Sequence, residues 1–195
     1  MRADSPELGN LALDFLHTLR RTRRGMLDLV RTPESLVAWL VTHGGERAAR
    51  RLQDPVPPSD GRLLLDEAQR LRRDIGMLVS SYAQSGALEP AAAYGVNRIL
   101  AACPRSWTLM TEAGRVVLSE QELAQGCLGS LSGIAEAAAQ LVSTFEPARI
   151  RRCASGMCSA WFVDTSKAGR RRWCSMALCG NREKASVHRS RPRSG

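Results

Sequence analysis

Four of the six cysteines in this 195-residue chain stand in two matched pairs near its carboxy-terminal end. Cys153 and Cys158 are separated by four residues, Cys174 and Cys179 are also separated by four, and fifteen residues lie between the pairs. A loop of that length can bring both pairs around one ion, and thiolates suit zinc in a tetrahedral site. Because protein ligands would fill all four positions, the spacing predicts a structural zinc rather than a catalytic one.

Two other uses of paired cysteines stay open on spacing alone, namely disulfides and an iron–sulfur cluster. The amino terminus shows no secretion signal, which favours reduced thiols, and iron–sulfur clusters more often use other spacings. His188 lies nine residues beyond Cys179 and is not expected to be a ligand. We expect Cys103 and Cys127, outside the pairs, to be small buried apolar residues.

The positive charge of the chain is concentrated in the same region. Residues 147–195 carry ten Arg and two Lys against two acids, a net charge of +10, whereas residues 1–146 carry a net charge of −1. A nearly neutral globular region followed by a basic module is typical of nucleic-acid-binding proteins, although a basic tail that is merely solvated has the same composition.

The residues before this module form a mostly helical pattern. With 44% hydrophobic residues the chain can bury a core. Apolar periodicity predicts helices over residues 7–19, 33–43, 62–85, 90–103 and 121–145, of which 62–85 is the longest. Thr32 and Pro33 form a helix start, residues 20–30 and 54–61 are expected to be irregular, and alternation around Glu112-Ala113-Gly114 predicts a hairpin. Pro147 marks the expected boundary between domains 1–146 and 147–195.

Between the cysteine pairs, an apolar stretch from Trp161, a turn and a return to Trp173 predict a second hairpin, and a helix is expected to follow Cys174. A knuckle, a hairpin and a helix that carries the second ligand pair form a treble-clef-like finger. The predicted fold class is therefore α+β: a mainly helical domain with one hairpin, followed by a small zinc finger.

These motifs resemble a known family. The paired cysteines, "WFVDTSKAGRRRWCSMALCGNR" and the basic continuation are similar to the CGNR zinc finger, whose name stands here as Cys179-Gly180-Asn181-Arg182. "LGNLALDFLHT" and "TPESLVAWL" resemble the opening of the ABATE domain, with His17 in place of an expected Asn. The resemblance implies a stress-associated bacterial transcription regulator with a structural zinc and a DNA-binding carboxy terminus.

The candidate nucleic-acid contacts share a basic side chain and a place on the return segment or the helix after it: Arg170, Arg171, Arg172, Arg182, Lys184, His188, Arg189 and Arg191. Strand alternation would send Arg171 to the opposite face from its two neighbours. Asn181 is expected to hold backbone groups beside the metal loop. DNA is the expected partner, and an RNA-binding or protein-recruiting finger is the alternative. A single small finger binds weakly, so a homodimer is predicted.

The amino-terminal domain offers one polar set, Asn10, Asp14 and His17, whose spacing of four and three residues would line a ligand pocket on a helix. Capping and surface roles compete with that interpretation. No nucleophile motif, phosphate-binding glycine loop or open metal site is present, so the protein is not expected to be an enzyme. No apolar stretch approaches the roughly 18 residues that span a bilayer. The expected location is therefore the cytoplasm, on the nucleoid.

Overall fold

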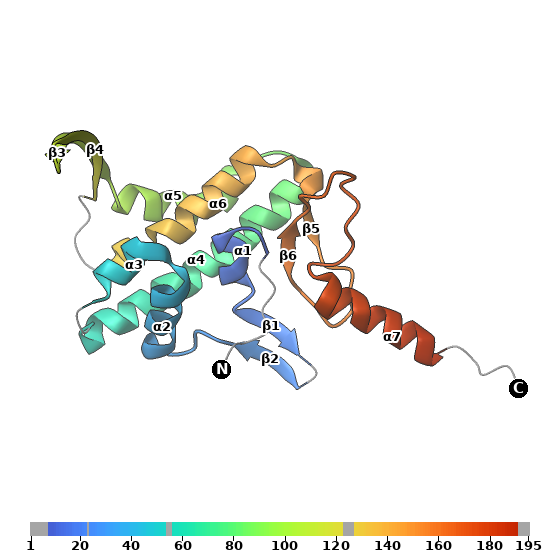
Figure 1. The fold of residues 1–195 in the computed structure, drawn as a ribbon. Coiled ribbons are helices and arrows are strands. Elements are labelled where there is room, and N and C mark those ends of the chain that lie inside the picture. Colours follow the sequence, from blue (N-terminus) through green and yellow to red (C-terminus); the bar gives the residue numbers. More distant parts are fainter. Residues whose placement is uncertain (1–7, 23, 54–55, 123–126, 191–195) are drawn as a thin grey trace, which may run out of the picture.

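The computed structural model describes residues 8–22, 24–53, 56–122 and 127–190 of the chain. A mainly helical body occupies most of it, and a small finger with a projecting helix follows at the carboxy-terminal end (Figure 1). The helical elements of the body are α1 (Leu11–Leu16), α2 (Pro33–His43), α3 (Gly45–Arg51), α4 (Pro58–Ser85), α5 (Pro90–Ala102), η1 (Cys127–Leu131) and α6 (Ser132–Thr144).

The long helix α4 is the centre of the body, and α1, α2, α5 and α6 pack against it (Figure 1). Its apolar stripe includes Leu64, Leu71 and Ile75, all fully buried. Such a stripe at helical spacing stabilises a helix by packing rather than by propensity. The prediction of the longest core helix is confirmed, although α4 begins at Pro58, inside the proline-rich segment expected to be irregular. Proline suits the first turn of a helix, where its missing N–H costs no bond.

The start of α2 follows the prediction closely. Thr32 caps the helix by accepting a hydrogen bond from the Ser35 backbone, and Pro33 takes the first helical position. Gly44 ends the helix, as expected, but α3 follows directly and was not predicted. Trp39 packs in the core against Phe15, with ring centroids 5.2 Å apart.

The predicted helix over residues 7–19 is shorter in the structure. Asn10 caps α1, which ends at Leu16. The chain then forms a hairpin of β1 (Leu19–Thr22) and β2 (Gly25–Asp28), where an irregular segment was expected. The two strands pair antiparallel. The Leu29 backbone donates to the Thr18 carbonyl (2.9 Å), and this hydrogen bond closes the base of the hairpin. Periodicity missed this element because four-residue strands are too short to show alternation.

The hairpin predicted around Glu112-Ala113-Gly114 is confirmed: it consists of β3 (Arg105–Glu112) and β4 (Arg115–Glu122). Arg105 pairs with Glu122 at its base. Ala113 and Gly114 adopt φ values of 48° and 78°, as a two-residue primed turn requires. The helix predicted over 121–145 is wrong in its first part: β4 continues to Glu122, residues 123–126 lie outside the described residues, and α6 begins only at Ser132. Trp107 is a large aromatic residue, which predicts a place in the core, but its side chain also lies outside what the structure describes.

The finger contains η2 (Pro147–Arg149), β5 (Ile150–Arg152), β6 (Trp161–Val163), the π-helical turn η3 (Met176–Gly180) and α7 (Asn181–Ser190). β6 pairs antiparallel with β5, so the predicted pairing of Trp161 with the segment returning to Trp173 is wrong. The strand pair packs on the body, and its residues Ile150 and Val163 are buried. The helix expected after Cys174 is confirmed.

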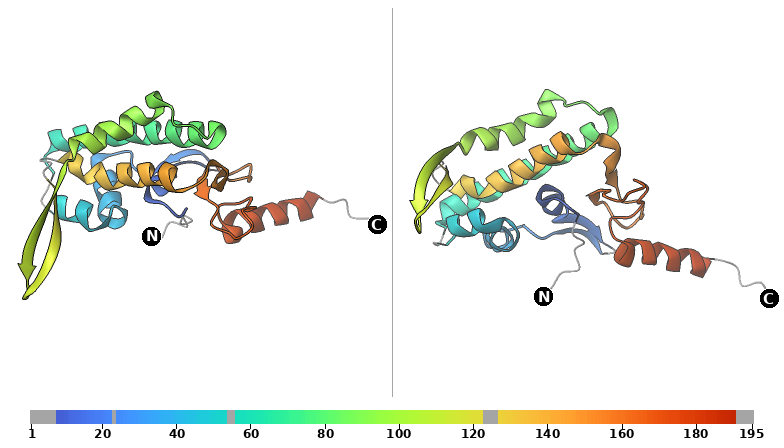
Figure 2. Two further views of the ribbon diagram at one scale, coloured as in Figure 1. Left: turned by 90° about the horizontal axis from the view of Figure 1, so that it is seen from above. Right: turned by 45° about the horizontal axis from the view of Figure 1, so that its top comes forward.

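The finger shares one apolar core with the body. Ile150, Phe162 and Val163 belong to the same buried cluster as α1 and α4, and Val163 donates to the Leu8 carbonyl (3.3 Å). Helix α7 extends away from the body, and the β3–β4 hairpin extends from its opposite end (Figure 2). Within the described residues, no helix is both long and apolar enough to cross a membrane.

Candidate metal centre and basic surface

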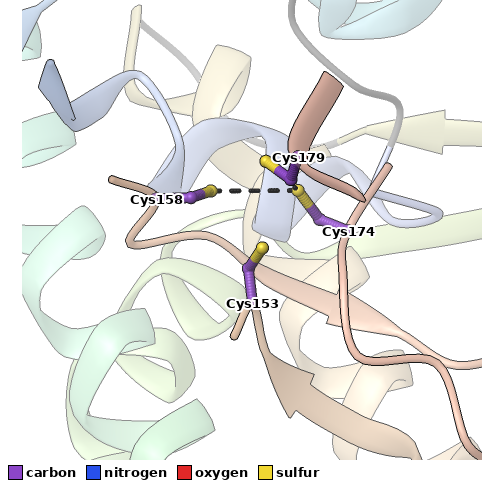
Figure 3. Close-up of side chains that lie close together, drawn as sticks. All are labelled: Cys153, Cys158, Cys174 and Cys179. Atoms are coloured by element: carbon purple, nitrogen blue, oxygen red, sulfur yellow. Dashed lines mark hydrogen bonds between the residues drawn. The ribbon is translucent and has the colours of Figure 1, made fainter. Parts of the chain in front are cut away.

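The four paired cysteines converge on one point (Figure 3). All four Sγ atoms lie within 4.8 Å of one another, and Cys174 Sγ lies 3.8 Å from Cys158 Sγ and 3.7 Å from Cys179 Sγ. Four sulfurs at the usual zinc–sulfur distance in a regular tetrahedron would be about 3.8 Å apart. The arrangement fits one structural zinc, with all four ligands from the protein.

Backbone hydrogen bonds place each pair. Cys153 donates to the Ala160 carbonyl (2.9 Å), which closes the knuckle between β5 and β6. Ser175 caps η3 through its side chain, and its carbonyl accepts a hydrogen bond from Cys179 (2.9 Å). Two bonds then join the halves: Ala154 donates to the Arg172 carbonyl (2.8 Å), and Ser155 Oγ donates to Glu183 Oε1 on α7 (2.6 Å).

The four neighbouring thiols change one another's acidity. Cys158 and Cys174 share a hydrogen bond between their sulfurs, which lowers the pKa of Cys158 to about 3, with further contributions from His17 and Cys153. That bond, together with burial, raises the pKa of Cys174, and burial beside the charge of Cys158 raises the pKa of Cys179 to about 12. Without a cation, Cys174 and Cys179 therefore keep their protons beside the Cys158 thiolate, and a bound dication would stabilise the thiolate form of all four residues.

The two remaining cysteines lie apart from this centre. Cys103 is buried, as expected, and its thiol points at the Leu128 carbonyl, 3.9 Å away. Cys127 is half-buried, and burial raises the pKa of its thiol.

Asp164 organises the loop between the two cysteine pairs, a role that the sequence analysis missed. Its side chain is 1% exposed. Oδ1 accepts hydrogen bonds from the backbone N–H (3.1 Å) and Oγ (2.6 Å) of Ser166, and Oδ2 accepts one from the Arg171 backbone (2.7 Å). These bonds outweigh the effect of burial and lower the pKa of Asp164 to about 2. The Asp-x-Ser pattern was the available signal, since such residues fold back on their own backbone.

Three arginines of the module point inward and hold this loop. Arg149 Nη1 donates to the Ser166 carbonyl (2.7 Å), and Arg151 Nη1 donates to the Gly169 carbonyl (2.8 Å). Arg171 Nη2 donates to the Cys174 carbonyl (2.7 Å), and its guanidinium lies 5.0 Å from the centre of the Phe162 ring. Arg171 is thus turned away from its neighbours, but by these bonds rather than by strand alternation, because residues 170–173 form no strand.

The remaining described cations of the module are exposed: Arg152, Lys167, Arg170, Arg172, Arg182 and Lys184. Arg172 lies over Trp173, 5.3 Å from the ring centre. A Cβ on Gly180 would collide with Met176 and lie 3.3 Å from Trp173, so glycine here lets Trp173 lie against the start of α7. Arg172 therefore lies beside the first turn of the helix that carries Arg182. Arg191 and the side chains of His188 and Arg189 lie outside what the structure describes.

Asn181, expected to hold backbone groups, does not do so. Its side chain is exposed and makes no hydrogen bond within the described part of the chain. Ser175 closes the metal loop instead.

The polar set of the amino-terminal domain does not converge on one pocket. Asn10 Nδ2 donates to the Ala137 carbonyl (2.9 Å), and its Oδ1 caps α1, while Asp14 Oδ1 accepts from the Leu8 backbone (3.0 Å). These two side chains position α1 against α6 and the chain before it. His17 faces the finger and interacts with Cys158.

A groove of about 450 Å³ separates His17 and β1 from the finger. The side of the body contributes His17, Arg20, Arg21 and Thr22, and the side of the finger contributes Met157, Cys158, Cys174, Leu178, Cys179 and Arg182. The arginines of β1 were not among the predicted nucleic-acid contacts, because the net charge of the first 146 residues is close to zero. The local signal for them was the run "RRTRR".

A helical body followed by a four-cysteine zinc site and a basic helix defines a zinc-finger protein. Residues 149–192 match the family model of the CGNR zinc finger, and residues 9–144 match the ABATE model, described as "Putative stress-induced transcription regulator". The chain belongs to the ABATE family and carries a CGNR zinc finger, which confirms the resemblance inferred from its motifs. A comparison with curated proteins finds no match.

Proposed function

We propose that this regulator binds duplex DNA through the exposed cations of its zinc finger. Family membership supports a transcription regulator with a zinc finger, and the finger is the most basic part of the chain. The protein then acts by binding and not by catalysis, since four thiolates would leave zinc no position for water or substrate. Its place of action is the nucleoid in the cytoplasm.

The observation that carries the proposal is the division of the arginines. Arg149, Arg151 and Arg171 satisfy backbone carbonyls inside the finger. Arg172 and Arg182, by contrast, are exposed, and their guanidinium groups can reach phosphates or guanine edges. A basic tail that is merely solvated would not fold into a loop in which some arginines bind backbone carbonyls while the others stay exposed.

Salt-dependent binding tests this proposal directly. Anisotropy titrations of the zinc-loaded chain with labelled genomic duplexes should give a log–log salt slope of roughly −5 to −7, as expected for six to eight phosphate contacts. Arg182→Ala/Lys184→Ala should reduce the magnitude of the slope by about 2.

The matched control for that variant is Arg62→Ala/Arg115→Ala, which removes the same charge from exposed positions. Arg62 lies near the start of α4 and Arg115 begins β4. Both of these starts lie at the end of the body away from the finger (Figure 1). The control should bind like the wild type. Equal losses in both variants would mean that binding follows net charge rather than the finger, and the proposal would be wrong.

Two finer features of the proposal have their own measurements. Competition between DNA and RNA oligonucleotides at one salt concentration separates a DNA-binding finger from an RNA-binding one, and preferential displacement by RNA would reverse the assignment. Light scattering after gel filtration, with and without DNA, tests the homodimer that two half-sites would require. A mass of one chain in both samples contradicts the dimer.

A further inference from the structure

We propose that the β1–β2 hairpin of the helical body is a second phosphate-contacting element, so that a nucleic-acid backbone follows the groove between this hairpin and the start of α7. The inference rests on the proposed function and extends it to residues of the ABATE region. It begins with the location of the groove, whose two walls come from segments more than 130 residues apart in the chain.

The charge of the groove fits a polyanion. Arg20 and Arg21 line one wall and Arg182 lines the other, and no carboxylate is among the described lining residues. Arg24 is exposed at the turn of the hairpin, beyond the groove. Lys184 is also exposed, two residues after Arg182 and on a different side of α7. Cations thus extend beyond the groove along the hairpin, which matches an extended phosphate backbone better than one small anion.

The nearest acids have partners elsewhere. Asp28, at the base of the hairpin, binds the Arg72 guanidinium of α4 with both oxygens (2.8 and 2.6 Å). Glu183, next to Arg182, accepts the hydrogen bond of Ser155 on the knuckle. Asp28 is thus paired with a cation of the body, and the Glu183 carboxylate is held at the knuckle rather than in the groove.

The same contacts hold the hairpin in place. Arg72 is buried and also donates to Thr18 Oγ1 (2.8 Å), directly before β1. At the other end, Thr22 Oγ1 donates to the Gly25 carbonyl (2.8 Å) and accepts from the Arg24 backbone (3.2 Å). The arginines of the hairpin are therefore presented on a fixed support beside the finger, which lowers the entropy lost on binding.

The zinc centre has its own need for positive charge, since a zinc ion with four thiolates keeps a formal charge of −2. Half-buried Arg20 lines the groove beside Cys158 and Cys179 and has interactions of its own, so it is not assigned to the phosphates. Exposed Arg21 and Arg24 are assigned to the phosphates.

The test is a salt titration of Arg21→Ala/Arg24→Ala in the zinc-loaded full chain, beside the wild type, Arg182→Ala/Lys184→Ala and the control Arg62→Ala/Arg115→Ala. Removing two phosphate contacts should reduce the magnitude of the log–log slope by about 2 and weaken binding about tenfold at moderate salt. Zinc content and circular dichroism should equal those of the wild type, because neither arginine holds the fold.

The outcomes separate this inference from the proposed function. A wild-type slope for Arg21→Ala/Arg24→Ala, together with a reduced slope for Arg182→Ala/Lys184→Ala, would overturn the inference and leave the function intact. A wild-type protein that binds no DNA overturns both. A calorimetric titration with inorganic phosphate covers the small-anion alternative: saturable binding that needs Arg21 and Arg24, with an unchanged DNA slope, would also overturn the inference.

Discussion

The body and the finger of this chain are held together by different forces. The body buries a continuous apolar stripe along α4, including Leu64, Leu71 and Ile75, against its neighbouring helices. The finger has few apolar residues beyond the strand pair that docks on the body. Its loop is held by one buried carboxylate, Asp164, by arginine bonds to backbone carbonyls and by the four thiolates around zinc.

This difference shows how arginine serves two purposes in one molecule. Arg72 in the body and Arg171 in the finger are both structural, because each donates hydrogen bonds to acceptors within the protein. The exposed arginines around α7 have no such acceptors in the described part of the finger and remain for a partner. Composition alone counts all of them equally as positive charge.

Removing zinc should separate the two regions most clearly. A chelator should unfold residues 164–190, because structural zinc supplies roughly 10 kcal/mol or more of apparent folding free energy. The helices of the body should keep most of their far-ultraviolet circular dichroism, since all four metal ligands belong to the finger. Complete loss of helical signal on chelation would mean that the body cannot fold without the finger.

Leu71→Ala should give the reverse pattern. Leu71 is fully buried in α4, so its truncation should lower the free energy of unfolding by about 2–5 kcal/mol. At temperatures where the variant is folded, it should still bind one zinc per chain. Denaturant unfolding gives the first quantity, and a colorimetric zinc assay gives the second; a parallel loss of zinc would show that the regions fold as one unit.

The ion pair of the body predicts a specific dependence on pH. The hydrogen bonds from Arg72 lower the pKa of Asp28 below its ordinary value of 3.8. Its stabilisation is therefore fully present above about pH 4 and is lost as the pH falls through the folded-state pKa. Asp28→Asn should cost about 2 kcal/mol at pH 7 and less in acid. Both proteins lose zinc in acid, so the difference between their unfolding curves isolates Asp28; a difference independent of pH would contradict the prediction.

Adjacent arginines of the finger give the smallest but most local test. Arg171→Ala should destabilise the finger by about 1–2 kcal/mol, because the Cys174 carbonyl and the Phe162 ring lose their partner. Arg170→Ala, at an exposed position, should change stability by less than about 0.5 kcal/mol and should weaken DNA binding instead. The midpoint of zinc release during thermal unfolding compares the two variants. Equal effects on stability would remove the distinction between inward and outward arginines.

Features that depend on residues close together in the chain could be predicted from the sequence alone. The spacing of Cys153, Cys158, Cys174 and Cys179 predicts a zinc site, because two close pairs of thiolates suit a tetrahedral zinc ion. Thr32 and Pro33 mark the start of α2, and the stripe of α4 marks a core helix, since capping and periodicity act within a few residues.

The strand pairing of the finger, the direction of its arginines and the position of the β1–β2 hairpin could not be predicted, because these features depend on contacts between distant segments. β6 pairs with β5 rather than with the segment before Cys174, and Ile150 and Val163 of this strand pair are buried. Which arginines point inward depends on carbonyls that the folded loop supplies. The approach of the β1–β2 hairpin to α7 depends on Arg72, a residue of α4 that no local pattern connects to either element.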